Sequence, residues 1–187
     1  LTGLWYETLK PAADAVWAPD VAHGVTGLVD GDQVTLRDVR NFRWIDEDHA
    51  NEAWETRTYD LSQLSGVDMF TSVWDNPDIA HLLVSFGFTS GQHVVFSVEI
   101  RRKAGEEFST IGGFFRQFEQ VLIAADEEDI VKLRTNYRKE DVSLYPLNLS
   151  PETMRGLFLS YVKLGNDLAA KPAFYNTITA NCASTVY

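Results

Sequence analysis

Residues 80–100 read AHLLVSFGFTSGQHVVFSVEI, and this stretch decides the fold. It contains two strongly apolar runs, 80–88 and 93–100, separated by the four residues Thr89-Ser90-Gly91-Gln92. Apolar runs rich in β-branched and aromatic residues on either side of a short glycine-containing turn are typical of a β-hairpin. We therefore predict a pair of antiparallel strands joined by this turn.

Further strands are predicted on both sides of the hairpin. Apolar residues alternate with charged ones over 33–44, with a break near Arg37, and again over 53–59. These two segments flank the acidic loop 46–51, which favours a second hairpin at the edge of an antiparallel sheet. Two shorter strands are predicted over 120–125 and 141–147.

Two helices are predicted from their capping residues and charges. Residues 126–138 begin with acidic residues and end with basic ones, which matches the helix dipole. A longer amphipathic helix starts after Ser150 as N-cap, with Pro151 in its first turn, and extends to about Lys171. Residues 106–118 are also compatible with a helix, although Gly112-Gly113 weakens that prediction.

These elements predict an α+β domain with a mostly antiparallel sheet. A chain of 187 residues, 45% of them hydrophobic, is long enough for one core and short enough for one domain. Residues 1–32 are interpreted as an N-terminal helix followed by a Pro- and Gly-rich connector, forming one structural unit with residues 33–187.

The charge of the chain limits its partners. Asp and Glu number 27 against 16 Lys and Arg, which gives a formal net charge of -11. Nucleic acid is therefore not expected as a partner, because phosphates are bound by basic surfaces. No run of apolar residues is long enough to span a bilayer. Both ends of the chain are expected to be processing edges, so a membrane anchor would lie outside it.

Cys182 is the only cysteine, and its surroundings suggest chemistry. It is followed by small residues that could open a helix with Asn181 as its cap. A thiol at a helix N-terminus has a lowered pKa, and the backbone amides there can bind an oxyanion. The alternative interpretation is a small, buried and inert cysteine, which local context alone favours slightly.

A reactive thiol needs a base, and the chain has four histidines. We predict that His23, His49 and His93 are exposed, because they lie in a Gly-rich segment, in an acidic loop and beside a turn. His81 differs, because it stands at the head of an apolar strand, where its side chain can project from the end of a sheet into a cleft. A structural role for a histidine at a strand edge remains the alternative.

The hairpin register gives His81 a partner. If the strands pair through the turn 89–92, Glu99 lies almost directly across from His81 and could orient its imidazole. A slip of one residue would turn Glu99 to the other face. No metal-ligand spacing and no nucleotide-binding motif is present, so neither a metal nor another cofactor is expected.

Several segments, in the right order, resemble the family typified by the N-terminal periplasmic domain of Lnb. The resemblance extends from about Trp17 to the end of the chain, and its clearest segments are 39–42, 54–61, 79–81 with 85–88, 133–145 and 174–182. Proteins of this type are bacterial membrane proteins implicated in lipoprotein N-acylation, with this domain outside the cytoplasmic membrane. The resemblance thus implies the periplasm or the outer side of that membrane, with attachment through segments outside the chain.

The family core is similar to the permuted papain-like proteins, which include NlpC-type peptidases and lecithin:retinol acyltransferase. Its histidine strand precedes the cysteine helix, as His81 precedes Cys182. The resemblance implies a papain-like catalytic domain over 33–187, with Cys182 as nucleophile, His81 as base and Glu99 as third polar group. It further implies a set of oxyanion or substrate-binding residues and cleft walls: Asn176, Asn181, Trp74 and Tyr175. The family often has Asn-Cys-Thr-Thr where this chain has Asn181-Cys182-Ala183-Ser184, which puts substrate preference in doubt.

The leading hypothesis is cysteine-dependent acyl transfer through a thioester on Cys182, with a lipid or lipoprotein as substrate. A cysteine amidase or peptidase acting on cell-wall peptide would use the same residues. A non-enzymatic extracytoplasmic binding module with an inert Cys182 is the third interpretation. The sequence does not indicate the oligomeric state.

Overall fold

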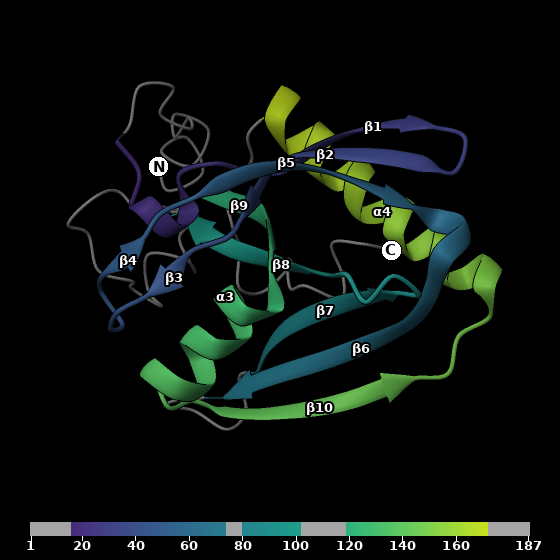
Figure 1. Ribbon diagram of the computed structural model, residues 1–187. Coiled ribbons are helices and arrows are strands. Elements are labelled where there is room, and N and C mark those ends of the chain that lie inside the picture. The colour runs from purple at the N-terminus through teal and green to yellow at the C-terminus, as the bar shows by residue number, and fades with distance from the viewer. Residues whose placement is uncertain (1–15, 74–79, 102–118, 172–187) are drawn as a thin grey trace, which may run out of the picture.

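The fold is described from a computed structural model, which covers residues 16–73, 80–101 and 119–171. Its main sheet has eight strands in the order β1-β2-β9-β8-β7-β6-β10, with β5 paired to the other side of β2 (Figure 1). All of these pairs are antiparallel except β2 with β9, so the predicted α+β class with a mostly antiparallel sheet is confirmed. The strands are β1 (Thr26–Asp30), β2 (Gln33–Arg40), β5 (Trp54–Asp60), β6 (Leu64–Val73), β7 (Ala80–Phe88), β8 (His93–Arg101), β9 (Glu119–Ala125) and β10 (Asp141–Leu147).

The predicted hairpin 80–100 forms β7 and β8 in the middle of this sheet. In its ladder Leu83 pairs with Ser97 and Gly87 with His93. The turn closes where the Gln92 carbonyl accepts from the Phe88 N–H at 3.0 Å, and Gly91 has φ 87°, a conformation that glycine adopts readily. The turn chemistry of the sequence therefore sets the register of the two strands.

The second predicted hairpin is also present. Strands β2 and β5 pair antiparallel, and the loop between them carries the small ladder of β3 (Arg43–Trp44) with β4 (Ala50–Asn51). The break in the pattern of 33–44 is a β-bulge, at which Asp38 has φ 61°. The bulge turns the end of β2 from β1 to β9, with which Val39 and Arg40 pair.

Two strands of the main sheet, β1 and β6, were not predicted, and neither was the short β4. The connector assigned to residues 1–32 is wrong for residues 26–30, which form β1 and pair with β2. Its glycine suggested a turn, but Gly27 lies in the ladder opposite Leu36, where a Cβ would come within 2.8 Å of a Val162 methyl group. Strand β6 lacks a clear period of two in its sequence, because its buried apolar residues Val67 and Phe70 are three positions apart and belong to different core clusters.

Two of the predicted helices are present where the sequence placed them. Helix α3 (Glu127–Lys132) continues into a π-helical turn, Leu133–Tyr137, and α4 spans Pro151–Ala170. The N-terminus of α4 is capped by the Ser150 hydroxyl, which accepts from the Thr153 N–H at 3.2 Å. The helix predicted at the start of residues 1–32 and the one predicted over 106–118 lie outside the described residues. None of the helices within the described ranges is long and apolar enough to cross a bilayer.

Both faces of the sheet are packed. On β8, Val94 and Phe96 join a core cluster under α4, whereas Val95 belongs to a second cluster that includes Ile130 of α3. This alternation is the period of two of a strand. The two helices therefore cover opposite faces of β8 and β9.

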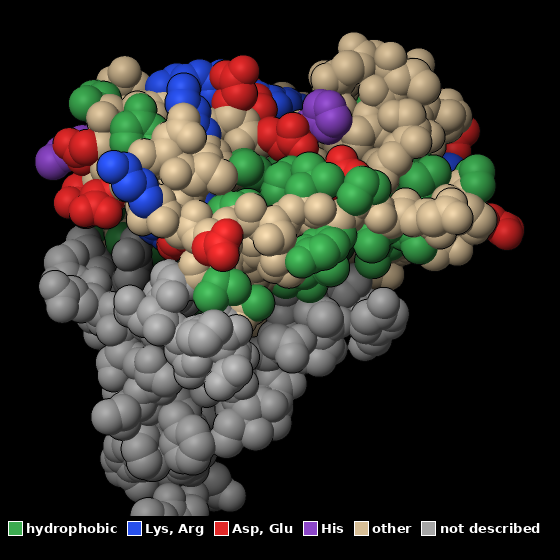
Figure 2. All heavy atoms as spheres, turned by 90° about the horizontal axis from the view of Figure 1, so that it is seen from below, with side chains coloured by type: hydrophobic (Ala, Val, Ile, Leu, Met, Phe, Trp, Pro, Cys, Tyr) green, Lys and Arg blue, Asp and Glu red, His purple; other side chains and the backbone are tan. Residues whose placement is uncertain are grey.

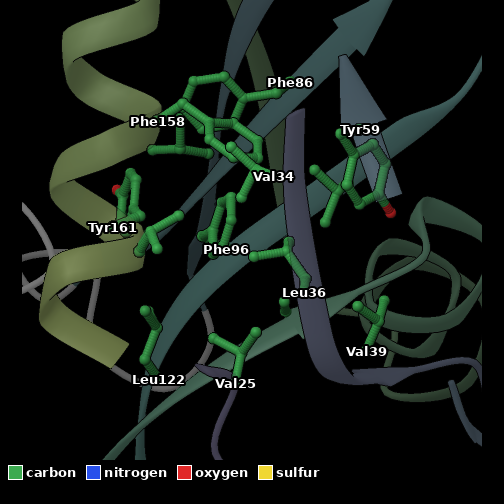
Figure 3. Packing of buried hydrophobic residues seen from close by; sticks show 14 of the residues in the cluster. Val25, Val34, Leu36, Val39, Tyr59, Phe86, Phe96, Leu122, Phe158 and Tyr161 are labelled. Atoms are coloured by element: carbon green, nitrogen blue, oxygen red, sulfur yellow. The ribbon is translucent and has the colours of Figure 1, made fainter. Parts of the chain in front are cut away.

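Aromatic residues fill the core under α4 (Figure 3). Phe158 points from the helix into this core, is fully buried, and has its ring centroid 5.0 Å from that of Phe86 and 5.4 Å from that of Phe96. Tyr161, one turn later, stacks on Phe96 with the centroids 4.9 Å apart. The helix is thus held to the sheet by ring packing.

Phe158→Ala is expected to lower the free energy of unfolding by about 3–5 kcal/mol, because it removes the ring at the centre of this cluster and leaves a cavity. Urea unfolding followed by tryptophan fluorescence would measure the loss. Lys163→Ala on the outer face of the same helix, where the side chain is 77% exposed, should change it by less than about 0.5 kcal/mol. A similar loss in both variants would show that helix propensity, and not the core, is being measured.

The surface near β10 is partly apolar. Seen from the side of this strand, hydrophobic side chains form a band with acidic groups around it (Figure 2). Leu144 and Tyr145 of β10 are about half exposed. On this face the charged groups are therefore interrupted by an apolar band.

Candidate active site

His81 lies near the start of β7, on the face of the sheet that α3 covers. It is opposite Ser72 of β6 in the ladder. On its other side, β8 presents Ser97 and Glu99 to the same face as Val95, because residues two apart on a strand share a face. The sheet thus brings three polar side chains together near the end of two central strands.

Two described side chains contact the imidazole of His81 through the same ring nitrogen. Nε2 lies 2.7 Å from the Ser97 hydroxyl and 3.3 Å from Oε1 of Glu99. The Ser97 hydroxyl donates its proton to Glu99 Oε1 at 2.8 Å, so toward His81 it acts as the acceptor. Nε2 must therefore carry a proton, and in the neutral imidazole the basic lone pair is on Nδ1.

Glu99 is an anion in this setting. Burial alone would raise the pKa of its carboxyl group. The charges of His81 and Arg134, together with hydrogen bonds from His81 and Ser97, outweigh burial and hold the pKa of Glu99 well below its ordinary value. A carboxylate beside Nε2–H orients the ring and stabilises an imidazolium.

A second carboxylate and an arginine complete the cluster. Arg134, from the π-helical turn, is 4% exposed and donates from Nη2 to Glu99 at 3.0 Å and from Nη1 to Glu140 at 2.9 Å. Glu140 also accepts a hydrogen bond from the hydroxyl of Ser72. We refer to His81, Ser97, Glu99, Arg134, Glu140 and Ser72 as the His81 network.

The other histidines lie at the surface, as predicted. His49 is 74% exposed and pairs with Asp46, and His93 is 41% exposed beside Glu127. His23 is exposed, with its ring edge-on to Trp54. Of the four histidines, all of which are described, His81 alone combines low exposure, 14%, with a carboxylate partner. Within the described ranges, no group of three His, Cys, Asp or Glu side chains could hold a metal ion.

Of the predicted site residues, the structure places His81 and Glu99 in contact. The register that puts them together is the one the turn predicts, since Leu83 pairs with Ser97, and His81 and Glu99 each lie two positions further from the turn. The roles assigned to them stay predictions. The other predicted residues, Cys182, Asn176, Asn181, Tyr175 and Trp74, lie outside the described residues.

Four members of the network were not predicted, namely Ser97, Arg134, Glu140 and Ser72. Ser97 could have been found, because it lies two residues before Glu99 on the same strand face. Arg134 comes from the π-helical turn and Glu140 from the residue just before β10, and only the packing of α3 over the sheet brings Arg134 to Glu99. Their position could not be read from local sequence.

Comparison with known families identifies the family of this chain. The model of the Lnb N-terminal periplasmic domain matches residues 50–187. The chain belongs to this family. The match includes Cys182 and the whole His81 network, whereas the similar segment 39–42 lies before it. As a member of the Lnb N-terminal domain family, the chain is a periplasmic domain. Neither the curated proteins nor the solved structures contain a match.

Proposed function

We propose that this Lnb-type domain is a cysteine-dependent acyltransferase of permuted papain-like type, in which His81 activates the thiol of Cys182. The observation that carries the proposal is the anchoring of His81 through Nε2–H by Ser97 and Glu99. Such anchoring fixes the ring in the tautomer whose Nδ1 can accept a proton.

The first half-reaction follows from this tautomer. Nδ1 of His81 takes the proton of the Cys182 thiol, and the thiolate attacks the acyl carbonyl of an ester. A carbon–sulfur bond forms, the ester carbon–oxygen bond breaks, and the imidazolium returns the proton to the leaving alcohol. The negative charge of Glu99 stabilises the imidazolium between these two proton transfers.

The second half-reaction restores the enzyme. An amine attacks the thioester carbonyl and His81 removes a proton from the amine. An amide carbon–nitrogen bond forms, the acyl carbon–sulfur bond breaks, and Cys182 is released as the thiolate beside the His81 imidazolium. Asn181 or Asn176 would supply an oxyanion contact in both halves, and Trp74 and Tyr175 would wall the acyl cleft. Membership of a periplasmic family named for Lnb supports a lipid donor and a lipidated amine as acceptor.

Intact-mass analysis after incubation with phosphatidylethanolamine and phosphatidylglycerol vesicles tests the proposal. Wild type should gain one acyl mass that hydroxylamine removes, with release of lysophospholipid. Cys182→Ser should show neither, and His81→Ala should release lysophospholipid at least about 10²-fold more slowly, the usual contribution of a general base.

The controls separate the alternatives. His93→Ala changes an exposed histidine outside the His81 network and should behave as wild type. Cleavage of cell-wall peptide by wild type, without reaction on vesicles, would replace the acyltransferase with an amidase. Failure on both substrates, with Cys182→Ser indistinguishable from wild type, would leave a binding module.

A further inference from the structure

The His81 network links the histidine to a group of buried charged side chains. Glu99 contacts His81 on one side and Arg134 on the other, and Arg134 continues to Glu140. Glu140 is in turn bonded to Ser72, which is the ladder partner of His81. The chain of contacts therefore starts at the histidine and returns to the neighbouring strand beside it.

Arg134 owes its position to an unusual backbone. The turn that carries it is π-helical, and the Arg138 N–H donates to the Leu133 carbonyl at 2.9 Å. Lys139 then has φ 51°, which reverses the chain so that the Glu140 N–H donates to the Arg134 carbonyl at 2.9 Å. Single π-helical turns are frequent at functional sites. This reversal sets the side chain of Glu140 against Arg134.

Burying this charged cluster has a high cost in free energy. The side chains of Arg134, Glu140 and Glu99 are only 5%, 9% and 18% exposed, and buried charges carry a large desolvation cost. Nε of Arg134 is buried without a hydrogen-bond partner among the described residues. The position of this guanidinium is therefore fixed by the two carboxylates, although not all five of its N–H donors are used.

The geometry points to Arg134 as a positioning residue for His81. Its two terminal nitrogens form a fork that joins Glu99 to Glu140, which holds the Glu99 carboxylate against Nε2 of His81. Removing the fork frees Glu99 to rotate, and the ring then loses the contact that keeps Nδ1 directed to the thiol. This inference rests on the proposed function only in that the imidazole serves Cys182.

A double-mutant cycle on Cys182 alkylation tests the inference. Arg134→Met and Glu99→Gln should each slow the reaction of Cys182 with iodoacetamide about tenfold, as when an outer-shell partner is lost. The double variant should be no slower than Glu99→Gln, because Arg134 acts through Glu99. Effects that multiply in the double variant would overturn the inference, since a structural role predicts independent losses.

Two further variants keep the test decisive. Arg138→Met removes a neighbouring arginine whose Nη1 is 3.9 Å from Glu140, and it should leave the rate unchanged. If Arg134→Met does not fold, Arg134→Lys replaces it in the cycle. Lysine keeps the charge but lacks the fork, so it should recover only part of the rate. Full recovery by lysine would contradict positioning by the fork.

Nitrogen-15 NMR of His81 separates this inference from the acyltransferase proposal. A solvent-protected Nε2–H signal is expected in wild type and in Cys182→Ser, because Ser97 and Glu99 hold that proton without the thiol. The protection should be lost in a folded Arg134 variant. Persistence of the signal there would refute positioning by Arg134. Its loss would support positioning even if no acyl adduct ever forms.

Discussion

His81→Ala is expected to slow the alkylation of Cys182 by iodoacetamide about 10²-fold at pH 6, where an ordinary thiol is almost entirely protonated. In wild type the imidazolium of His81, backed by Glu99, would hold the neighbouring thiol as a thiolate. The chain has one cysteine, so the rate reports on Cys182 alone.

The pH profile of the same reaction gives the reason for the difference. In wild type the alkylation rate should rise with a midpoint at a pH well below about 8.5, the ordinary pKa of a thiol. In His81→Ala the midpoint of this rise should shift back to about pH 8.5. Circular dichroism would establish that the variant is folded. Equal rates in the two proteins would remove His81 as the base.

Asp129→Ala is expected to lower the free energy of unfolding by about 3–5 kcal/mol, the usual loss when one partner of a buried ion pair is removed. Asp129 is fully buried and accepts from both Nε and Nη2 of Arg40 at 2.8 Å. It also accepts from the Phe42 N–H and the Trp44 indole, each at 2.8 Å. Without Asp129 the guanidinium of Arg40, itself 2% exposed, would be buried with its main partner gone.

Urea unfolding measures this loss against two comparisons. Glu128→Ala, one residue earlier with a side chain 75% exposed, should change the free energy by less than about 0.5 kcal/mol. The double variant Arg40→Met/Asp129→Leu should regain much of the stability, because well-packed apolar residues can replace a buried pair. A loss below about 1 kcal/mol in Asp129→Ala would contradict the importance of the pair.

The ion pair also matters for the site. Asp129 joins the first turn of α3 to the end of β2 and to β3, and α3 leads directly into the turn that carries Arg134. A shift of α3 would therefore move the arginine away from Glu99. We attribute the placement of the His81 network to this buried anchor as much as to the sheet.

The strands with clear alternation or a clear turn could be predicted from the sequence. The turn at 89–92 determines the register of β7 and β8, and through it the approach of Glu99 to His81. Asp38 disturbs the pattern of β2 because the strand bulges there. In these places local chemistry and the final structure agree.

Tertiary packing determines what the sequence did not reveal. Strand β1 carries a glycine because Val162 of α4 leaves no room for a side chain, so a close contact resembled a turn signal. Arg134 reads as an ordinary basic residue near the end of a helix, yet it is buried between two carboxylates. A single sequence cannot distinguish such a residue from a solvated one.

A crystal structure that resolves Cys182 beside His81 tests the central claim most directly. The measurement is the distance between Sγ of Cys182 and Nδ1 of His81. We predict that it lies within about 4 Å, allowing for loose geometry without substrate. A sulfur atom buried among apolar side chains and beyond about 8 Å from the imidazole, too far for proton transfer even through one water, would contradict the account.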